Sequence, residues 1–240
     1  MILVAPKAHP FSMYDKATEM HGVLTLTNLG LYGKGYLDFP EAKIASNQMV
    51  FKSKVMTADT SSMEIKSIGN KVTFKTPNVN TKMDFERKIG EFKSNAADIS
   101  TIFAENKYKA EINEFTWDMN KKILTFTSPP NSIGSRFTSI HPDQDSLFFF
   151  AKKAEYNMTS SIIKVDGAEE IRIADSRVMP FEGKLTILPD AKMQTLENAI
   201  IEGDTSNAWH VFDKCKLNIH GKNDMVGIGN YTLKVNNKDH

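Results

Sequence analysis

Three side chains that can bind a metal or transfer a proton stand at every second position of one short stretch, "SIHPDQDSLFFF". They are His141, Asp143 and Asp145. In a β-strand, alternate side chains share one face, so these three would converge on a hard or borderline cation. Pro142 argues against a central strand, because its nitrogen has no proton to donate to a ladder. We therefore predict a turn in which the aspartates cap backbone amides, and no metal site.

Three consecutive phenylalanines, Phe148, Phe149 and Phe150, follow in a strand that we expect to begin at Ser146. Successive side chains of a strand point to opposite faces, so at least one ring must point away from the core. Either both faces of this strand are covered, or one ring marks an interface. Of the two, we expect a contact with a neighbouring β unit.

A second group of ionisable residues lies in "KVDGAEEIRIADSR". Its members are Asp166, Glu169, Glu170, Asp175, Arg172 and Arg177. A polysaccharide-active β-helix needs carboxylates a few ångströms apart on one face, often with calcium and a basic residue. Here Ile171 and Ile173 alternate with Arg172, which is the ordinary pattern of a strand with a solvated charged face. We predict no catalytic residue in this segment.

The remaining reactive side chains have no partner at metal-ligand spacing. Cys215 is the only cysteine and lies in "FDKCKLNI", a strand pattern in which we expect it to be a small buried apolar group. For His210 and His220 we expect surface positions. Neither a P-loop nor Gly-x-Ser-x-Gly occurs. The sequence thus predicts no catalytic, cofactor-binding or metal-binding residue, no cofactor, and a protein that is not an enzyme.

Exposed aromatic rings on a sheet can stack on sugars. Trp117, with Tyr108 and Phe115 nearby, is the best candidate for such a platform. Phe115 and Trp117 are two residues apart, however, and would share one face of a strand. The simpler interpretation is that these rings belong to the core.

The composition describes a folded protein with an almost neutral field. In 240 residues, 30 Lys and Arg balance 29 Asp and Glu, and 40% of the residues are hydrophobic. The chain is therefore long enough for one large domain or two modest ones with a buried core. A net charge of +1 indicates no polyanionic partner, so we expect no nucleic-acid binding. No stretch is long and apolar enough for a transmembrane segment.

Short alternating apolar and polar runs recur along the chain, whereas helical periodicity is nearly absent. Examples are "GVLTLT", "QMVFKS", "KVTFKT", "GEFKSN" and "KLTILP", each bounded by turn-forming residues. We expect strands of four to seven residues, each with one buried face. The protein is predicted to be all-β.

One seven-residue pattern occurs twice, as "PEAKIAS" at Pro40–Ser46 and as "PDAKMQT" at Pro189–Thr195. Stacked short rungs, each completed by its neighbours, would generate such a pattern. We therefore predict an elongated β-solenoid or an open β jelly roll built from many short strands, with a compact β-sandwich as the main alternative. Residues 128–145 are the least regular region, with three prolines and Gly134, so we expect an N-terminal unit at 1–127, a connecting loop at 128–145, and a C-terminal β-repeat unit at 146–240.

Several long motifs carry a resemblance to a known family. They are "HPFSMYDKATEMHGVLTLTNLGLYGKGYLDFPEAKIASNQMVFKS", "NTKMDFERKIGEFKSN", "EFTWDMNKK", "HPDQDSLFFFAKKAEYN" and "DAKMQTLENAIIEGD". Over nearly its whole length the chain resembles very large, uncharacterised exported proteins of Bacteroidetes that are rich in β repeats. The resemblance implies that the chain is an interior segment of a longer protein of the periplasm or cell envelope. Asp145-Ser146-Leu147 looks like the acceptor triplet for O-glycosylation in exported proteins of that group. More loosely, the strands resemble the open jelly rolls of the OstA family, which stack into a bridge for lipopolysaccharide.

The functional expectation follows from the lack of a chemical site together with this resemblance. We expect a structural or interaction module of an envelope protein, whose partners are the neighbouring β repeats of the same parent chain. The first alternative is a module that binds and transports lipid or glycolipid, and the second is a polysaccharide-active β-helix. Under these alternatives the chain would also bind lipid or glycan.

Overall fold

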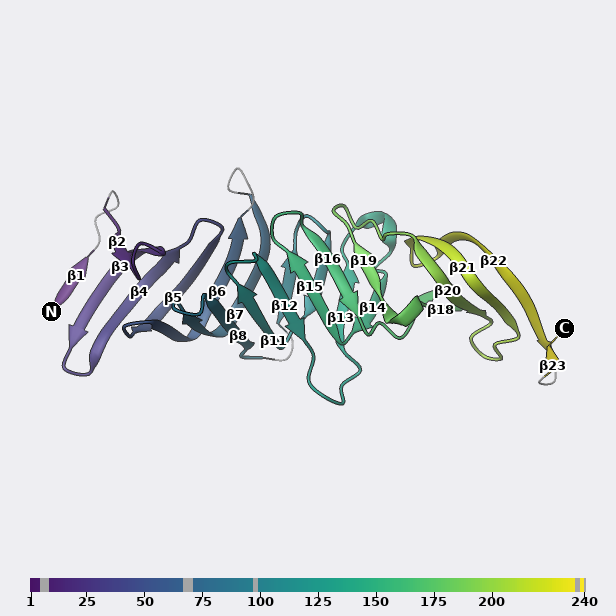
Figure 1. Ribbon diagram of the computed structural model, residues 1–240, viewed down its shortest axis with the longest axis horizontal. Helices are drawn as coiled ribbons and strands as arrows, with labels where there is room; N and C mark the ends of the chain where they lie inside the picture. Colours follow the sequence, from purple (N-terminus) through teal and green to yellow (C-terminus); the bar gives the residue numbers. More distant parts are fainter. Residues whose placement is uncertain (5–8, 67–70, 97–98, 236–237, 240) are drawn as a thin grey trace. The chain divides into compact units, whose positions relative to one another are not determined.

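The computed structural model describes residues 1–4, 9–66, 71–96, 99–235 and 238–239 (Figure 1). Strands make up 65% of the chain and helix 3%, so the protein is all-β, as predicted. The strands form one large antiparallel sheet that is not closed into a barrel.

Two compact units are distinguishable. Unit 1 comprises Met1–Ala104, Ile112–Phe126 and Asn157–Thr159, and unit 2 comprises Glu105–Glu111, Thr127–Tyr156 and Ser160–His240. The domain limits expected from the sequence stay a prediction. One part of the expected connecting loop at 128–145 is nevertheless a strand, β13 (Ser135–Ser139). It is a strand because β10 (Tyr108–Glu111) and β14 (Phe148–Ala151) pair with its two edges.

Unit 1 is built on a meander of long strands. Its elements are β1 (Ile2–Val4), β2 (Phe11–Met13), β3 (Thr18–Thr27), β4 (Gly30–Asp38), β5 (Ala42–Phe51), β6 (Val55–Lys66), β7 (Val72–Asp84), β8 (Ile89–Ser94), β9 (Ser100–Phe103), β11 (Glu114–Asp118) and most of β12 (Ile123–Thr127). From β3 to β8 each strand pairs antiparallel with the next. β11 pairs with β8, β9 pairs with β7, and the short strands β1 and β2 pair with β3.

The strands β5, β6 and β7 run for 10, 12 and 13 residues, longer than the four to seven expected. Within β5 and β6 the phase of burial changes once, and in β7 it changes a second time near the start, where Thr73 is buried next to Phe74. The inward side chains are Ala42, Ile44 and Ser46, then Met49 and Phe51, in β5; Met56 and Ala58, then Ser61, Met63 and Ile65, in β6; Phe74 and Thr76, then Val79, Thr81 and Met83, in β7. An alternation that switches from one parity to the other reads as two short strands, which is why the sequence predicted shorter elements.

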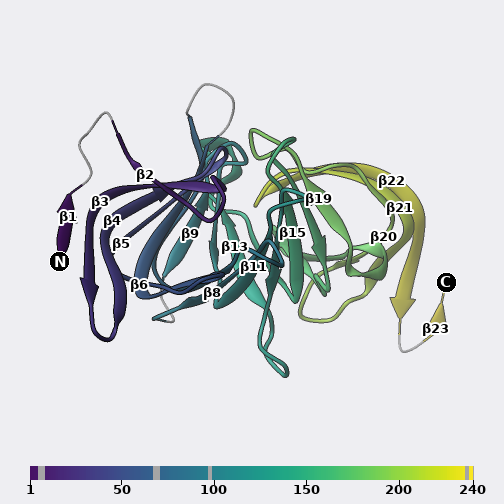
Figure 2. The same ribbon diagram turned by 60° about the vertical axis from the view of Figure 1, so that its left-hand side comes forward.

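A line of irregular pairings crosses β4 to β7 where the burial phase changes; we call it the crease. Register shifts occur between Gly33 and Gly35 in β4 and around Ser61 in β6. Ser46 Oγ donates a hydrogen bond to the carbonyl of Thr60 at 2.6 Å, and Ser61 Oγ donates to the carbonyl of Val79 at 3.0 Å. These hydroxyls donate to backbone carbonyls that lose their ladder partner where the pairing is interrupted. The strands curve, as Figure 2 shows, and keep an apolar face inward along their whole length.

The interior of unit 1 is filled by aromatic side chains and methionines. Phe74 is fully buried and lies 5.4 to 6.1 Å, between ring centroids, from Phe103, Phe115 and Phe126. Trp117 is 2% exposed and meets the Phe39 ring edge to face at 5.3 Å. Such pairs add to the free energy of burying apolar area. The prediction that Phe115 and Trp117 are core residues is confirmed, so they do not form a sugar platform.

Unit 2 continues the antiparallel pattern with shorter strands and two short 3-10 helices. Its elements are β10, β13, η1 (Pro142–Gln144), β14, β15 (Lys153–Asn157), β16 (Ile162–Asp166), β17 (Ile171–Ile173), β18 (Ser176–Met179), η2 (Phe181–Gly183), β19 (Leu185–Ile187), β20 (Leu196–Gly203), β21 (His210–Gly221), β22 (Asp224–Val235) and β23 (Lys238–Asp239). The ladder runs β10, β13, β14, β17, β18, β20, β21, β22 and β23, and β16 pairs with β19.

The three phenylalanines of β14 divide between the two faces of the sheet. Phe149 is 1% exposed and stacks on Phe137 with the ring centroids 5.4 Å apart. Phe148 and Phe150 lie half-buried on the opposite face and meet edge to face at 6.0 Å. The guanidinium of Arg136 covers the Phe148 ring at 4.3 Å, a cation–π contact. The expected contact of these rings with a neighbouring β unit stays a prediction.

The two copies of the seven-residue pattern share burial but not backbone conformation. Ala42 and Ile44 are fully buried in β5. Ala191 and Met193 are also buried, but they lie in a turn whose single bridge joins Met193 to Ile187. The pattern therefore predicts which side chains point inward, but it does not predict whether the segment is a strand.

Two glycines fix the close approach of β3 and β4. Gly22 and Gly35 are paired, at φ +135° and +142°, and a Cβ at Gly35 would lie 2.0 Å from the carbonyl oxygen of His21. Gly30 has the same φ of +142°, but no atom lies within 4 Å of its added Cβ. An alanine at Gly30 would therefore introduce backbone strain alone, whereas an alanine at Gly35 would introduce the same strain and a steric clash with β3.

We predict that Gly35→Ala lowers the free energy of unfolding clearly more than Gly30→Ala. Gly30→Ala should cost about 1–3 kcal/mol, the usual penalty for a residue held in a sparsely populated backbone region. Gly35→Ala should cost this amount plus the free energy needed to displace β3 from the new methyl group. Urea denaturation of both variants measures the difference. Equal losses would show that the contact between β3 and β4 is not tight.

Candidate functional site

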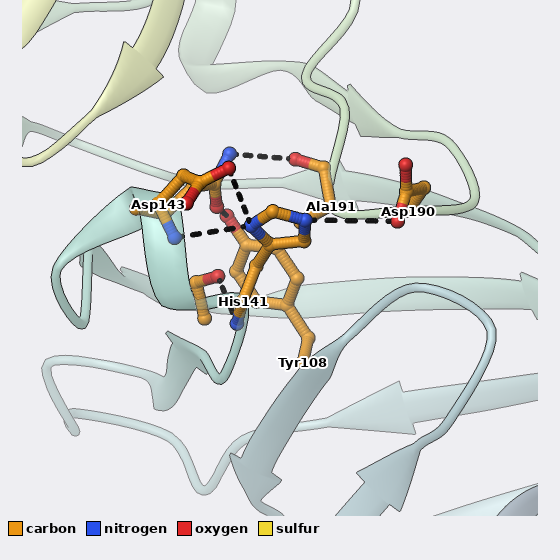
Figure 3. Close-up of polar contacts among 7 residues, drawn as sticks. Tyr108, His141, Asp143, Asp190 and Ala191 are labelled. Carbon is orange, nitrogen blue, oxygen red and sulfur yellow. Dashed lines mark hydrogen bonds and ion pairs between the residues drawn. The ribbon is translucent and has the colours of Figure 1, made fainter.

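The stretch at 141–146 is a turn, as predicted. Its centre is η1, and the His141 Nδ1 accepts a hydrogen bond from the Asp143 amide at 3.2 Å (Figure 3). The capping group is therefore the imidazole, where the sequence led us to expect aspartates. Asp145 and Ser146 both have positive φ, so β14 begins only at Phe148, two residues later than expected.

The three side chains at alternate positions do not converge. Asp145 lies apart from the imidazole and accepts a hydrogen bond from the Asn223 amide at 3.1 Å. His141 instead lies between Asp143, with Nδ1 to Oδ2 at 4.0 Å, and Asp190, with Nε2 to Oδ1 at 3.7 Å (Figure 3). Both of these carboxylates are exposed. Charge pairs at these distances in water are weak and are screened by salt.

Asp190 is the member of this group that the sequence did not reveal. It lies 49 positions after His141, in the second copy of the seven-residue pattern. The turn that carries it is held in place because the amides of Asp190 and Ala191 donate to the carbonyls of Glu105 and Asn106. Among the residues that the structure describes, no group of three or more His, Cys, Asp and Glu side chains is arranged to hold a metal ion.

Beneath this surface lies a buried polar connection, which we call the Gln144 clasp. Gln144 is 6% exposed; its Nε2 donates to the Ala191 carbonyl at 2.8 Å, and its Oε1 accepts from the Tyr108 hydroxyl at 3.3 Å. Burial raises the pKa of Tyr108 above its ordinary value, so the phenol stays a neutral donor. The clasp joins β10, η1 and the turn at Asp190, and its chemistry is structural.

Two acidic residues of the second candidate segment, Glu169 and Glu170, have different basic partners, and its Arg177 pairs with a third acid. Glu169 binds Lys152 at 2.6 Å, and this hydrogen bond lowers the pKa of the carboxyl. Glu170 binds Arg172 at 2.9 Å, and Arg177 binds Glu202 at 2.6 Å. The pattern of β17 is confirmed, since Ile171 and Ile173 are buried and Arg172 is exposed. The carboxylates in these pairs are neutralised separately and do not form a facing pair of the kind that glycoside hydrolysis uses.

One hollow of about 260 Å³ lies on unit 2 over β15, β16 and β19. Lys153, Lys164 and Lys184 line it together with Glu155 and Asp166. Lys153 donates to Glu155 at 2.8 Å, and this bond, aided by the charge of Asp166, raises the pKa of the lysine. The hollow could not be predicted from the sequence, because each lysine comes from a different segment and looks like part of a solvated face. Its chemistry suits a small anionic or polar group.

The other reactive residues lie where the sequence predicted. Cys215 is 2% exposed in β21, and burial, with the charge of Asp213, raises the pKa of its thiol. His210 and His220 are exposed. Ser146 of the triplet that resembles a glycosylation site is exposed, and the following Leu147 is fully buried. Modification at Ser146 stays a prediction.

Comparison with family models, with curated proteins and with solved structures finds no match to the chain. Among the described residues, none forms a helix that is both long and apolar enough to cross a membrane.

The Gln144 clasp can be tested as a double-mutant cycle. We predict that Gln144→Leu lowers the free energy of unfolding by about 2–4 kcal/mol, because it leaves the Tyr108 hydroxyl and the Ala191 carbonyl buried without partners. Adding Tyr108→Phe should cost less in the Gln144→Leu background than in the wild type, since the hydroxyl has then already lost its acceptor. Denaturant titration of the four proteins measures this, with Asp143→Ala as an exposed control. Strict additivity would contradict the clasp.

Metal addition tests the interpretation of the 141–146 turn. We predict that neither calcium nor zinc raises the thermal midpoint, because a cation would find only widely spaced, exposed carboxylates beside His141. A specific site would stabilise the folded state by about 2.7 kcal/mol at a metal concentration 100 times its Kd. Scanning calorimetry with and without metal measures the midpoint. A saturable rise that His141→Ala abolishes would establish a metal site.

Proposed function

We propose that the chain is a non-catalytic structural or interaction module of an envelope protein. The observation that supports this most directly is how the candidate chemical groups are used. The residues that could do chemistry are engaged one by one in a turn cap, a clasp or a separate ion pair. The aromatic residues, in contrast, are concentrated in filled interiors. Ionisable groups do gather in the hollow over β15, β16 and β19, but there Lys153 is already paired with Glu155.

For the architecture we favour the open jelly roll over the solenoid. Antiparallel pairing between strands that follow one another in sequence supports this choice, because a β-solenoid of stacked rungs pairs its strands in parallel. A sheet that bends at a crease and is not closed into a barrel also suits a roll. Placement in the envelope, and neighbouring β repeats as partners, rest on the resemblance to exported proteins of Bacteroidetes.

A second candidate function is binding of a lipid or glycolipid, and one observation favours it. The hollow places Lys153, Lys164 and Lys184 where a phosphorylated headgroup could bind, although Lys153 is paired with Glu155 and Lys184 with Glu182. The acyl chains would still need an apolar groove, and the interior of unit 1 is occupied by large side chains such as Phe74 and Trp117. We therefore rank the structural module first. The polysaccharide-active enzyme is not proposed, because the carboxylates near β17 pair with separate bases.

Complementation in the organism of origin distinguishes a structural module from an enzyme. In a strain that lacks this 240-residue segment, we predict that the His141→Ala and Asp166→Asn variants each restore detergent resistance as fully as the wild-type protein does. A general acid or base contributes roughly 10²- to 10⁴-fold to a reaction, so its loss would be visible. The measurement is the detergent concentration that halves growth. If either substitution abolishes rescue while the protein remains folded, the result supports an enzyme and contradicts the non-catalytic module.

Lipid uptake provides the companion control. Delipidated protein is mixed with fluorescent lipid A, and bound lipid is quantified after gel filtration. The structural module should retain no stoichiometric lipid, and Lys164→Glu should behave as the wild type. Saturable retention that Lys164→Glu weakens would favour the glycolipid function instead.

A further inference from the structure

The last long strand of unit 2 has an open edge. β21 pairs with one side of β22 from His210 to Gly221. On the other side, the only pairing in the described chain is with β23, which meets β22 at Lys234 and Val235. Among the described residues, no strand pairs with residues 224–233 along that edge.

This edge lacks the features that usually prevent strands from adding to a sheet. Natural edges are protected by short strands, prolines, bulges or charges. Both register shifts in this hairpin, one at Lys214 and one between Ile219 and Gly221, add a residue to β21 and leave β22 regular. From Met225 to Leu233 the strand has no charged residue and no proline. Ile228 is 77% exposed and Val226 57% exposed, so apolar surface accompanies the open backbone.

The hydrogen-bonding direction of β22 follows from one contact. The Lys234 amide donates to the Trp209 carbonyl at 2.8 Å, on the side of β21. Because amides alternate in direction along a strand, those of the odd-numbered residues from 225 to 233 point to the open edge. An antiparallel strand can therefore pair there only by facing these odd-numbered residues.

The limits of the edge select a register for self-pairing. A turn precedes Asp224, and β23 covers the strand from Lys234 onward, so Ile228 lies at the middle of the open segment. Antiparallel pairing of two copies about Ile228 places Ile228 against itself and Gly227 against Gly229. It also places Met225 against Tyr231, twice by symmetry, a favourable contact between a thioether and an aromatic ring. The odd-numbered residues then face one another, as the direction of the amides requires.

Charge supports the same register. Asp224 lies opposite Thr232, and its diagonal neighbour on the same face is Lys234 of the second copy. Diagonal neighbours about 7–8 Å apart are within reach of long side chains. Two such pairs of opposite charge flank the uncharged centre. A pairing between two copies about a two-fold axis is closed and ends at the dimer.

We propose that β22 pairs edge to edge with β22 of a second copy, antiparallel and centred on Ile228. The inference goes beyond the proposed function, because it adds a second copy of this chain to the neighbouring β repeats as a partner. Ile228, the most exposed apolar side chain of β22, would be buried against its own counterpart.

The test uses a residue that faces itself. The full chain is studied by sedimentation equilibrium over about 1–500 µM, a range that covers weak dimers. Wild type should show a concentration-dependent dimer. Ile228→Lys and Ile228→Glu should each raise the dimer Kd at least tenfold, because like charges meet at the two-fold axis. An equimolar mixture of the two variants should dimerise again, since lysine then faces glutamate.

A matched control is Ile133→Lys, which places the same change on a side chain that is 71% exposed and lies in a loop away from β22. It should leave the Kd unchanged. Circular dichroism and the urea midpoint verify that every variant is folded. A wild type that stays monomeric throughout, or a dimer that neither Ile228 variant weakens, overturns the proposal, and so does failure of the mixture to associate. Complementation by His141→Ala is independent of this result, so either proposal can fail alone.

Discussion

A single antiparallel sheet can enclose an apolar interior only if its strands bend, and a bend at a bulge changes which side chains point inward. This constraint governs unit 1. In β6 the inward positions change from Met56 and Ala58 to Ser61, Met63 and Ile65. The crease needs hydroxyls to satisfy the backbone where the ladder is interrupted, and Ser46 and Ser61 supply them. It also needs a close backbone approach next to it, which the paired Gly22 and Gly35 allow.

The same constraint explains what could be predicted about the fold. Alternation at period two is local, so the all-β class and the buried faces of β8, β11, β17 and β19 followed from the sequence. Strand length did not follow, because a phase change looks like a strand end. The second copy of the seven-residue pattern shows the reverse error. Ala191 and Met193 alternate inward in a turn held by backbone bonds to Glu105 and Asn106, contacts that no local pattern encodes.

The candidate site divides in the same way. Pro142 was sufficient to predict the turn, because its missing proton is a local fact. The neighbours of His141 were not predictable, since Asp190 is brought there by a contact between loops far apart in sequence. Gln144 was unremarkable in the sequence, yet it is the buried member of the turn and joins it to Tyr108 and Ala191. Polar residues whose partners are distant in sequence give no periodic signal, so structural and catalytic roles look alike until the partners are known.

A sheet that does not close into a barrel must also deal with its outer strands. In unit 1, β3 is covered by β1 and β2, each of three residues, and strands so short offer little backbone to a further chain. In unit 2 the outer strand β22 has 12 residues, and β23 protects only its end. The glycines at 227 and 229 are explained within the chain, because a Cβ at Gly229 would lie 2.4 Å from the Cys215 sulfur. The exposure of Val226 and Ile228 has no such explanation, since both face away from the buried Cys215, Leu217 and Ile219. Apolar residues on an outer strand carry a risk of aggregation unless something covers them. A closed pairing of two copies removes that risk with the residues already present.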